Sequence, residues 1–228
     1  MTDYLLQMLL PLSLLLLVLL AAQKLLLKSL GARSVYALWL AVPALLLASA
    51  LTPLLPQAVD AAVIKRYQVG IQQLTAAADK VNWLFWLWLA GVLVCSGFLL
   101  LSYISGRAQF NRATALTGNS KPAHCRQASN NAGPYITGLI RPHILLPHDF
   151  FHRFDTTQQQ LIVQHELTHW RRGDLHMNYL ALLLLCLCWF NPLCWLAYSR
   201  YRQAQELACD AVVTQHASKA ERIAYGYA

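Results

Sequence analysis

Long apolar blocks, separated by shorter polar stretches, dominate the first half of the chain. Three of these blocks, residues 4–22, 35–55 and 81–103, are long enough to cross the hydrocarbon core of a bilayer as helices, at about 1.5 Å per residue. The pattern predicts a membrane region of three transmembrane helices over residues 1–105. Residues 57–80, which are of mixed polarity, are expected to form an external loop between the second and third helices.

Basic side chains lie on only one side of the first apolar block and so predict its orientation. Lys24, Lys28 and Arg33 follow the block, whereas no basic residue precedes it. Because cytoplasmic loops are enriched in Lys and Arg, residues 23–34 are expected in the cytoplasm and the N-terminus outside. Residues 106–172 carry eight Lys or Arg against three acidic residues, which also places them inside.

Composition favours a multi-pass membrane protein over a nucleic-acid-binding protein. Hydrophobic residues make up 57% of the chain and charged residues 12%, which is more apolar than an ordinary soluble domain. The net charge is +8, but the basic residues border apolar blocks and form no cluster with interleaved aromatic side chains. The lipid bilayer is therefore an expected partner, and direct nucleic-acid binding is not expected. The six cysteines include no C-x-x-C pair and are expected to be small buried side chains.

Short β structure is predicted between the membrane region and the polar helices that follow. Residues 135–147 contain β-prone runs interrupted at Gly138 and Pro142, which predicts a small β-hairpin. Residues 111–133 are rich in Asn, Ser, Gly and Ala and predict loops or a short strand. The remainder of residues 106–228 has helical character, so the fold class is mostly α.

The sequence His165-Glu166-Leu167-Thr168-His169 is the strongest candidate for chemistry. Residues four apart lie on one face of a helix, so both histidines can point at one metal ion with the glutamate beside them. Asp155 as N-cap, with Gln158 three residues later and an apolar stretch after it, predicts a helix over residues 156–172. H-E-x-x-H on a helix is typical of zinc metalloproteases, in which the glutamate acts as general base. An amphipathic helix with ordinary surface or packing histidines is the alternative interpretation.

A second pair of carboxylates four residues apart, Glu206 and Asp210, occurs in another helix-compatible run, expected over residues 199–217. Glu206 can supply a third zinc ligand, and Asp210, one turn further on, can hold a ligand histidine in the required tautomer. Asp174 can orient a ligand in the same way or offset the charge of the arginines before it. Three other histidines are candidates for stabilising an oxyanion, although surface or packing positions suit them better: His143, His148 and His176.

Residues 175–198 are apolar enough for a fourth crossing, but the metal hypothesis excludes one. If His169 and Glu206 both lie about 2.0–2.2 Å from one zinc ion, the chain between them has to start and end on one side of the membrane. Asn191-Pro192 breaks this run into pieces of re-entrant length. The prediction is a helical hairpin that dips into the membrane and returns.

Four segments together resemble a known family. They are the H-E-x-x-H motif with Asp174, the run Trp189-Phe190-Asn191-Pro192-Leu193-Cys194-Trp195, the run Glu206-Leu207-Ala208-Cys209-Asp210 and the stretch from Gly138 to Pro147. They look like the membrane-embedded metallopeptidases of the BlaR/MecR type, the β-lactam sensor-transducer family, and the resemblance covers essentially the whole chain.

The resemblance implies a gluzincin-like site, facing the cytosol from a bacterial cytoplasmic membrane. His165, His169 and Glu206 would bind Zn²⁺. Glu166 would be catalytic, and Asp210 would support a ligand histidine.

The resemblance also implies a function. In the best-known members an external penicillin-binding domain follows a further transmembrane helix and signals to a cytosolic protease that inactivates a repressor. Residues 1–228 contain no such sensor, so antibiotic sensing is not carried over, and a fourth true crossing is expected from about Ala224 in a longer parent chain. The expected activity is that of a zinc metalloendopeptidase which cleaves a cytosolic or membrane-proximal protein, with a transcriptional repressor as one candidate substrate.

Two other functions remain open on the sequence alone. One is a housekeeping membrane protease, which would share the site and its cytosolic facing. The other is a catalytically silent membrane transducer whose zinc site is structural. A homodimer is compatible with all three functions.

Overall fold

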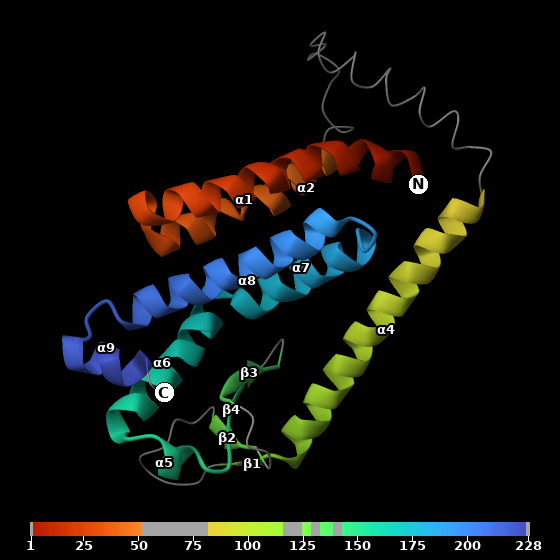
Figure 1. Cartoon of the computed structure of the whole chain (residues 1–228). Helices are drawn as coiled ribbons and strands as arrows, with labels where there is room; N and C mark the ends of the chain where they lie inside the picture. Colours follow the sequence, from red (N-terminus) through yellow and green to blue (C-terminus); the bar gives the residue numbers. More distant parts are fainter. Residues whose placement is uncertain (1, 52–81, 116–124, 129–132, 139–142, 227–228) are drawn as a thin grey trace. The chain divides into compact units, whose positions relative to one another are not determined.

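A computed structural model describes residues 2–51, 82–115, 125–128, 133–138 and 143–226 (Figure 1). The predicted external loop, residues 57–80, lies outside the described residues. The chain divides into two compact units, the first made of Met1–Val94 and Leu185–Ala204 and the second of Cys95–Leu184 and Gln205–Ala228. The predicted boundary at residue 105 lies inside a continuous helix.

The first unit begins with α1 (Thr2–Leu38), which is broken at Gly31, and continues into α2 (Ala41–Leu51). Residues 23–30, expected as part of a cytoplasmic loop, are helical, because this Leu-rich stretch contains no helix breaker. The loop is reduced to a break at Gly31, whose φ of 77° and ψ of 166° suit a residue without Cβ. α2 lies beside α1 (Figure 1).

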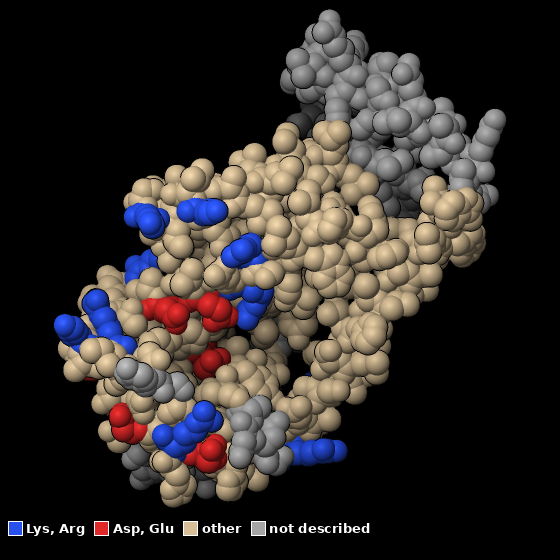
Figure 2. All heavy atoms as spheres, in the orientation of Figure 1, with Lys and Arg blue, Asp and Glu red and all other residues tan. Residues whose placement is uncertain are grey.

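Among the residues that the structure describes, two helical stretches are long and apolar enough to cross a membrane, by length and composition. One is Leu9–Ser49, which includes the Gly31 break and hence parts of the first two predicted crossings. The other, Trp83–Arg112, lies within α4 (Asn82–Arg112) and extends beyond the predicted third crossing. Large apolar side chains such as Trp86 and Phe98 are exposed along α4, and Figure 2 shows this helix as an uncharged surface until its C-terminal end.

The predicted break at Asn191-Pro192 is confirmed. α7 (Asp174–Leu187) ends shortly before it, and α8 (Pro192–Val213) begins with Pro192 in its first turn. Asn191 Oδ1 accepts a hydrogen bond from the Leu193 N–H at 3.0 Å, which caps α8, and proline at the next position loses no helical hydrogen bond. The expected division between residues 198 and 199 is absent, because no Gly or Pro interrupts α8 between Pro192 and Val213.

In the described part of the second unit, the sheet has four short strands in the order β1-β2-β4-β3. The predicted hairpin is present as β3 (Tyr135–Thr137) and β4 (His143–Leu146), which pair antiparallel. β2 (Cys125–Gln127) runs parallel to β4, and β1 (Thr114–Ala115) runs antiparallel to β2. The hairpin is therefore part of a larger sheet than the sequence predicted.

β4 supplies the core on both faces of this sheet. Because side chains alternate along a strand, Ile144 and Leu146 pack with Phe150 of α5 (Phe150–Arg153) and with Ile162. Leu145 points to the other face and packs with Ala113 and Ala128. The sheet is thus fixed against α6 (Thr156–Arg172), the helix that carries the H-E-x-x-H motif.

Candidate metal centre

Local sequence fixes both ends of α6, the helix on which His165 and His169 lie. The predicted capping box is present: Asp155 Oδ1 accepts from the Gln158 N–H at 2.8 Å, and Gln158 Oε1 accepts from the Asp155 N–H at 3.1 Å. Gly173 closes the helix with a φ of 72°, in the left-handed conformation that favours glycine. His165 and His169 lie between these caps, one helical turn apart.

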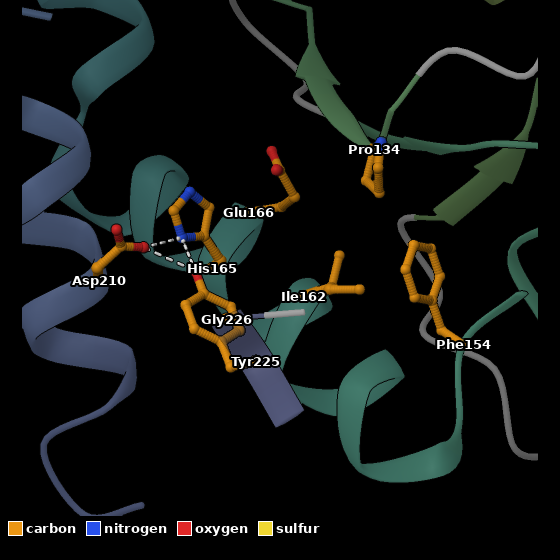
Figure 3. Close-up of a pocket in the computed structure, with 8 residues that line it drawn as sticks. All are labelled: Pro134, Phe154, Ile162, His165, Glu166, Asp210, Tyr225 and Gly226. Atoms are coloured by element: carbon orange, nitrogen blue, oxygen red, sulfur yellow. Dashed lines mark hydrogen bonds and ion pairs between the residues drawn. The ribbon is translucent and has the colours of Figure 1, made fainter. Parts of the chain in front are cut away.

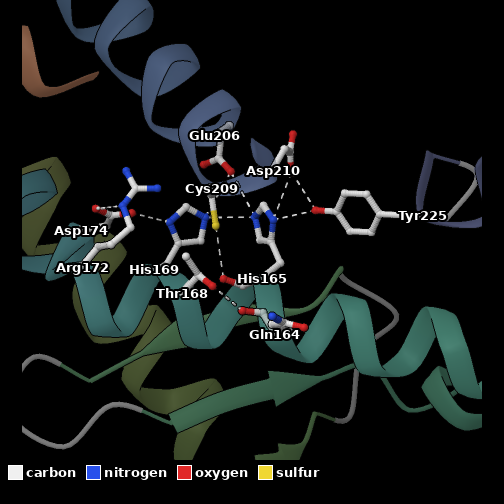
Figure 4. A network of polar contacts seen from close by, with 10 residues as sticks. All are labelled: Gln164, His165, Thr168, His169, Arg172, Asp174, Glu206, Cys209, Asp210 and Tyr225. Carbon is white, nitrogen blue, oxygen red and sulfur yellow. Dashed lines mark hydrogen bonds and ion pairs between the residues drawn. The ribbon is translucent and has the colours of Figure 1, made fainter. Parts of the chain in front are cut away.

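Three side-chain atoms converge from α6 and α8. His165 Nε2 and His169 Nε2 lie 3.0 Å apart, and Glu206 Oε2 lies 3.3 Å from the first and 3.2 Å from the second (Figure 4). Donors at the corners of a tetrahedron around a metal 2.0–2.1 Å away would be separated by about 3.3–3.4 Å. The three atoms therefore come close to the spacing of three corners of a tetrahedral metal site, with N, N, O chemistry.

Protonation of the two imidazoles, without a metal ion, does not satisfy the three converging atoms well. Burial opposes the protonation of both imidazoles, but hydrogen bonds to carboxylates outweigh it and raise the pKa of His165, chiefly through Asp210, and the pKa of His169, chiefly through Asp174. Two imidazolium rings would aim N–H groups at each other across 3.0 Å. A single cation at the centre of the three atoms would remove that conflict.

Each histidine is held from behind through its other ring nitrogen. His169 Nδ1 lies 2.7 Å from Oδ2 of the fully buried Asp174, whose Oδ1 is 3.5 Å from Arg172 Nε. His165 Nδ1 lies 3.2 Å from Asp210 Oδ1 and 2.6 Å from the Tyr225 hydroxyl. Acceptors placed on Nδ1 favour the tautomer with a free lone pair on Nε2, the atom that faces the centre.

Cys209 also belongs to this cluster, which the sequence-based interpretation of it as an ordinary buried cysteine missed. Its side chain is fully buried, and Sγ donates to the His165 carbonyl at 3.4 Å. The ligand atoms of His165, His169 and Cys209 lie within 4.8 Å of one another, so sulfur is a second available donor. Glu206 Oε2 is almost equally close to both Nε2 atoms, whereas Cys209 Sγ is hydrogen-bonded to the backbone.

Glu166 borders an open cavity of about 370 Å³ (Figure 3). Phe154, Ile162 and Pro134 line one side of the cavity, and polar groups including His165 and Tyr225 line the other. Burial raises the pKa of Glu166 to about 7, because the imidazoles of the two neighbouring histidines offset only part of it. A carboxylate with such a pKa can both accept and return a proton near neutral pH.

The structure brings together the six residues predicted as general base, metal ligands or supporting carboxylates, namely His165, Glu166, His169, Asp174, Glu206 and Asp210. It adds Cys209 and Tyr225. Tyr225 lies on α9 (Lys219–Gly226), which packs on α6, and no motif in the sequence indicated its role. The expected start of a further crossing near Ala224 stays a prediction; in the structure Ala224 lies within α9, and its carbonyl accepts from Gln158 Nε2 at 3.0 Å.

The three histidines considered for an oxyanion lie elsewhere. His143 begins β4, and its ring packs at a tilt against Phe110 with centroids 5.0 Å apart. The His148 carbonyl accepts a hydrogen bond from Gln127 at 2.7 Å. Neither these residues nor His176 is among the side chains that line the cavity beside Glu166.

Two histidines and a carboxylate on facing helices, with a second carboxylate at an open cavity, define the metallopeptidase class of site. Residues 3–228 match the family described as BlaR1 peptidase M56. The chain belongs to this family of membrane metallopeptidases.

Curated relatives support the same assignment. The chain is 36% identical to the regulatory protein BlaR1 of Bacillus licheniformis over 93 residues, which cover 41% of this chain and 15% of that protein. It is 29% identical to the methicillin resistance mecR1 protein of Staphylococcus aureus over 99 residues, or 43% of this chain and 17% of that protein. A protein of the same name from Staphylococcus epidermidis matches equally well. The matched segment thus spans about a sixth of these relatives.

Proposed function

We propose that this chain is a zinc-dependent metalloendopeptidase of the bacterial cytoplasmic membrane, which transmits a signal by cleaving a cytosolic or membrane-proximal regulator protein. The observation that carries the proposal is the triangle formed by His165 Nε2, His169 Nε2 and Glu206 Oε2 directly beside Glu166 and its cavity. The donor set, its spacing and an adjacent base are the requirements of peptide hydrolysis at a metal.

Each site residue has a distinct task in this proposal. His165, His169 and Glu206 hold the zinc ion, and Asp174 and Asp210 keep the imidazoles in the ligating tautomer. Bound zinc would supply a Lewis acid for the scissile carbonyl and lower the pKa of water. Glu166 would accept the proton of the attacking water and return it to the leaving amine.

A protein substrate with a regulatory role is inferred from the relatives' names, which describe a regulatory protein and a methicillin resistance protein. A transcriptional repressor is the partner proposed on this basis. Broad cleavage of unfolded proteins would instead mark a housekeeping protease with the same site.

We also propose that the site faces the cytosol and that the N-terminus lies outside. Lys24, Lys28 and Arg33 surround the Gly31 break in α1, where two apolar helical segments meet. Basic residues at such a turn favour the cytoplasmic side. The chain leaves the site at Asp174 and returns to it at Glu206, since both residues contact His169, so α7 and the first part of α8 are proposed to dip into the membrane without crossing it.

A structural zinc site in a silent transducer is the second candidate, and Cys209 favours it. Closed structural sites use four protein ligands and commonly include cysteine, whereas catalytic sites leave one position open. Movement of Sγ away from the His165 carbonyl would add a fourth ligand to the two histidines and Glu206. Zinc content without cleavage of any protein would identify this function.

The decisive experiment is a comparison of proteomes of the native host with wild-type chain and with Glu166→Gln. The substitution removes the base and keeps the shape of the side chain, so a substrate should accumulate intact only in the variant. One or a few stabilised regulators would support a signalling protease, and many unrelated proteins would support housekeeping. Identical cleavage products in both strains would refute a peptidase function.

A further inference from the structure

The two histidines of the centre are held in different ways. His169 Nδ1 is bonded directly to the Asp174 carboxylate at 2.7 Å. His165 Nδ1 lies 3.2 Å from the Asp210 carboxylate but only 2.6 Å from the Tyr225 hydroxyl, which itself donates to Asp210 at 2.7 Å. Tyr225 is thus the nearest partner of His165 on the side away from the proposed metal.

The protons that each group can donate determine the direction of the hydrogen bonds among His165, Tyr225 and Asp210. A phenol is neutral below its ordinary pKa of about 10 and has one proton to donate. A carboxylate only accepts, so the Tyr225 proton points to Asp210, and the phenol oxygen is left to accept from His165 Nδ1–H. With Nδ1 protonated in this way, the lone pair of neutral His165 lies on Nε2 and faces Glu206 and His169.

We propose that Tyr225 is a positioning residue, which relays the hydrogen bond of Asp210 to His165 and so makes metal affinity depend on the docking of α9. The proposal rests on the proposed metal site and adds that α9 controls metal binding there. It concerns the hydroxyl group, because the ring has a separate packing role against Leu161, Cys209 and Val213.

α9 carries none of the proposed metal ligands, so its detachment would leave the helices that bear them in place. It has only eight residues, none of them buried, and the ligands themselves lie on α6 and α8. Its own start is capped locally, since Ser218 N–H donates to Glu221 and Glu221 N–H donates to Ser218 Oγ. Beyond Tyr225, the described polar contact to α6 is the bond from Gln158 to the Ala224 carbonyl. Such short surface elements open at low free-energy cost.

Substitution by phenylalanine separates the two roles of Tyr225. Tyr225→Phe keeps the ring in its packing cluster and deletes the relay, so the Zn²⁺ dissociation constant of the 228-residue chain in detergent should rise about 10–100-fold, as for other groups behind metal ligands. Competition with a zinc chelator measures this constant. Tyr135→Phe is the matched control, because it also deletes one phenol hydroxyl, bonded to Gln109 at 2.8 Å, and should leave the constant unchanged.

A double-mutant cycle tests whether Tyr225 acts through Asp210 or whether its loss loosens the whole site. If Tyr225 acts through Asp210, the combination of Tyr225→Phe with Asp210→Asn should weaken Zn²⁺ binding little more than the stronger single change. The pair Tyr225→Phe and Asp174→Asn acts on different histidines, so its two losses should add. Additivity in the first pair, or an unchanged dissociation constant in Tyr225→Phe, would overturn the proposal.

Coupling between α9 docking and metal binding has to act in both directions, which allows a test on the wild-type chain. If α9 docking favours metal, then metal must favour docking by the same factor, and Zn²⁺ should slow amide hydrogen exchange over residues 219–226. Unchanged exchange there despite bound Zn²⁺ would also overturn the proposal. If wild-type chain binds no Zn²⁺ at all, the metal site fails rather than the relay.

Discussion

The Nε2 atoms of His165 and His169 lie 3.0 Å apart, and a carboxyl-bearing partner stands behind each ring. Left to themselves, two nitrogens at this distance can share only one proton. The folded chain keeps them there through Asp174 on one side and through Asp210 with Tyr225 on the other. Preorganisation of this kind lowers the cost of metal binding, because neither ring has to turn when the ion enters.

Replacement of the proposed ligand Glu206 should reduce metal binding, whereas replacement of the proposed base Glu166 should reduce turnover and leave metal binding intact. Glu206→Gln removes a charged oxygen and should weaken Zn²⁺ binding by more than about 100-fold, beyond the range for groups behind the ligands. Glu166→Gln should keep the metal while turnover falls by about 10²–10⁴-fold. Metal analysis of the purified variants and a peptide-cleavage assay measure both effects. Full zinc occupancy in Glu206→Ala would remove Glu206 from the ligand set.

Glu166 should make the metal-free protein less stable as the pH rises. Burial raises its folded pKa from 4.5 to about 7, so the folded state binds this proton more tightly than the unfolded state. The contribution of Glu166 to stability is then most favourable below pH 4.5 and decreases up to about pH 7, above which its full cost of roughly 3 kcal/mol applies. Glu166→Gln should remove this cost at pH 8 and change little at pH 4.5. Denaturant unfolding in the presence of a chelator measures the difference, and equal effects at both pH values would contradict it.

Sequence predicted α6 and the shared face of its two histidines well because the determinants are local. Asp155, Gln158 and Gly173 specify the ends of the helix, and four-residue spacing specifies which side chains share a face. The sheet was only half predicted, since β2 has three residues and pairs with β4 through a parallel contact that no local pattern encodes. Tyr225 reaches His165 from 60 positions away, and only the packing of α9 on α6 brings them together.

Gly91 should be intolerant of any side chain, because a Cβ there would overlap the Trp189 indole. The contact is reinforced by two hydrogen bonds, from Trp88 Nε1 to the Leu187 carbonyl at 2.9 Å and from Trp189 Nε1 to the Trp88 carbonyl at 3.2 Å. Gly91→Ala should lower the free energy of unfolding in detergent by about 1–3 kcal/mol. Gly97→Ala on the same helix meets no atom within 4 Å and is the control. Equal stability of the two variants would rule out a tight contact at Gly91.

The proposed orientation predicts which introduced cysteines an impermeant reagent reaches in intact cells. Lys65→Cys, in the expected external loop outside the described residues, should be labelled. Ser29→Cys, exposed near the Gly31 break, should be labelled only after the cells are opened. Both are compared in a background whose six native cysteines are replaced by serine or alanine. Labelling of Ser29→Cys in intact cells would reverse the orientation.

Residues 175–198 should not cross the bilayer despite their hydropathy. A crossing helix of about 20 residues is roughly 30 Å long, which would carry Glu206 far from His169. In the structure, Glu206 Oε2 instead lies 3.2 Å from His169 Nε2, and the chain has broken and restarted at Asn191-Pro192 in between.

Cysteines placed before and after this segment test the return directly. Arg171→Cys and Gln203→Cys are both exposed positions and should be labelled together, from the cytosolic side only. Asn191→Ala is a useful companion, because it deletes the cap of α8 and the bond from Nδ2 to Ser13 Oγ at 3.0 Å. It should destabilise the turn by about 1 kcal/mol without moving either cysteine to the other side. Labelling of the two cysteines from opposite sides would show that Glu206 is not a ligand. Cys209 would be excluded by the same topology, so the third ligand of the two histidines would have to come from another part of the chain.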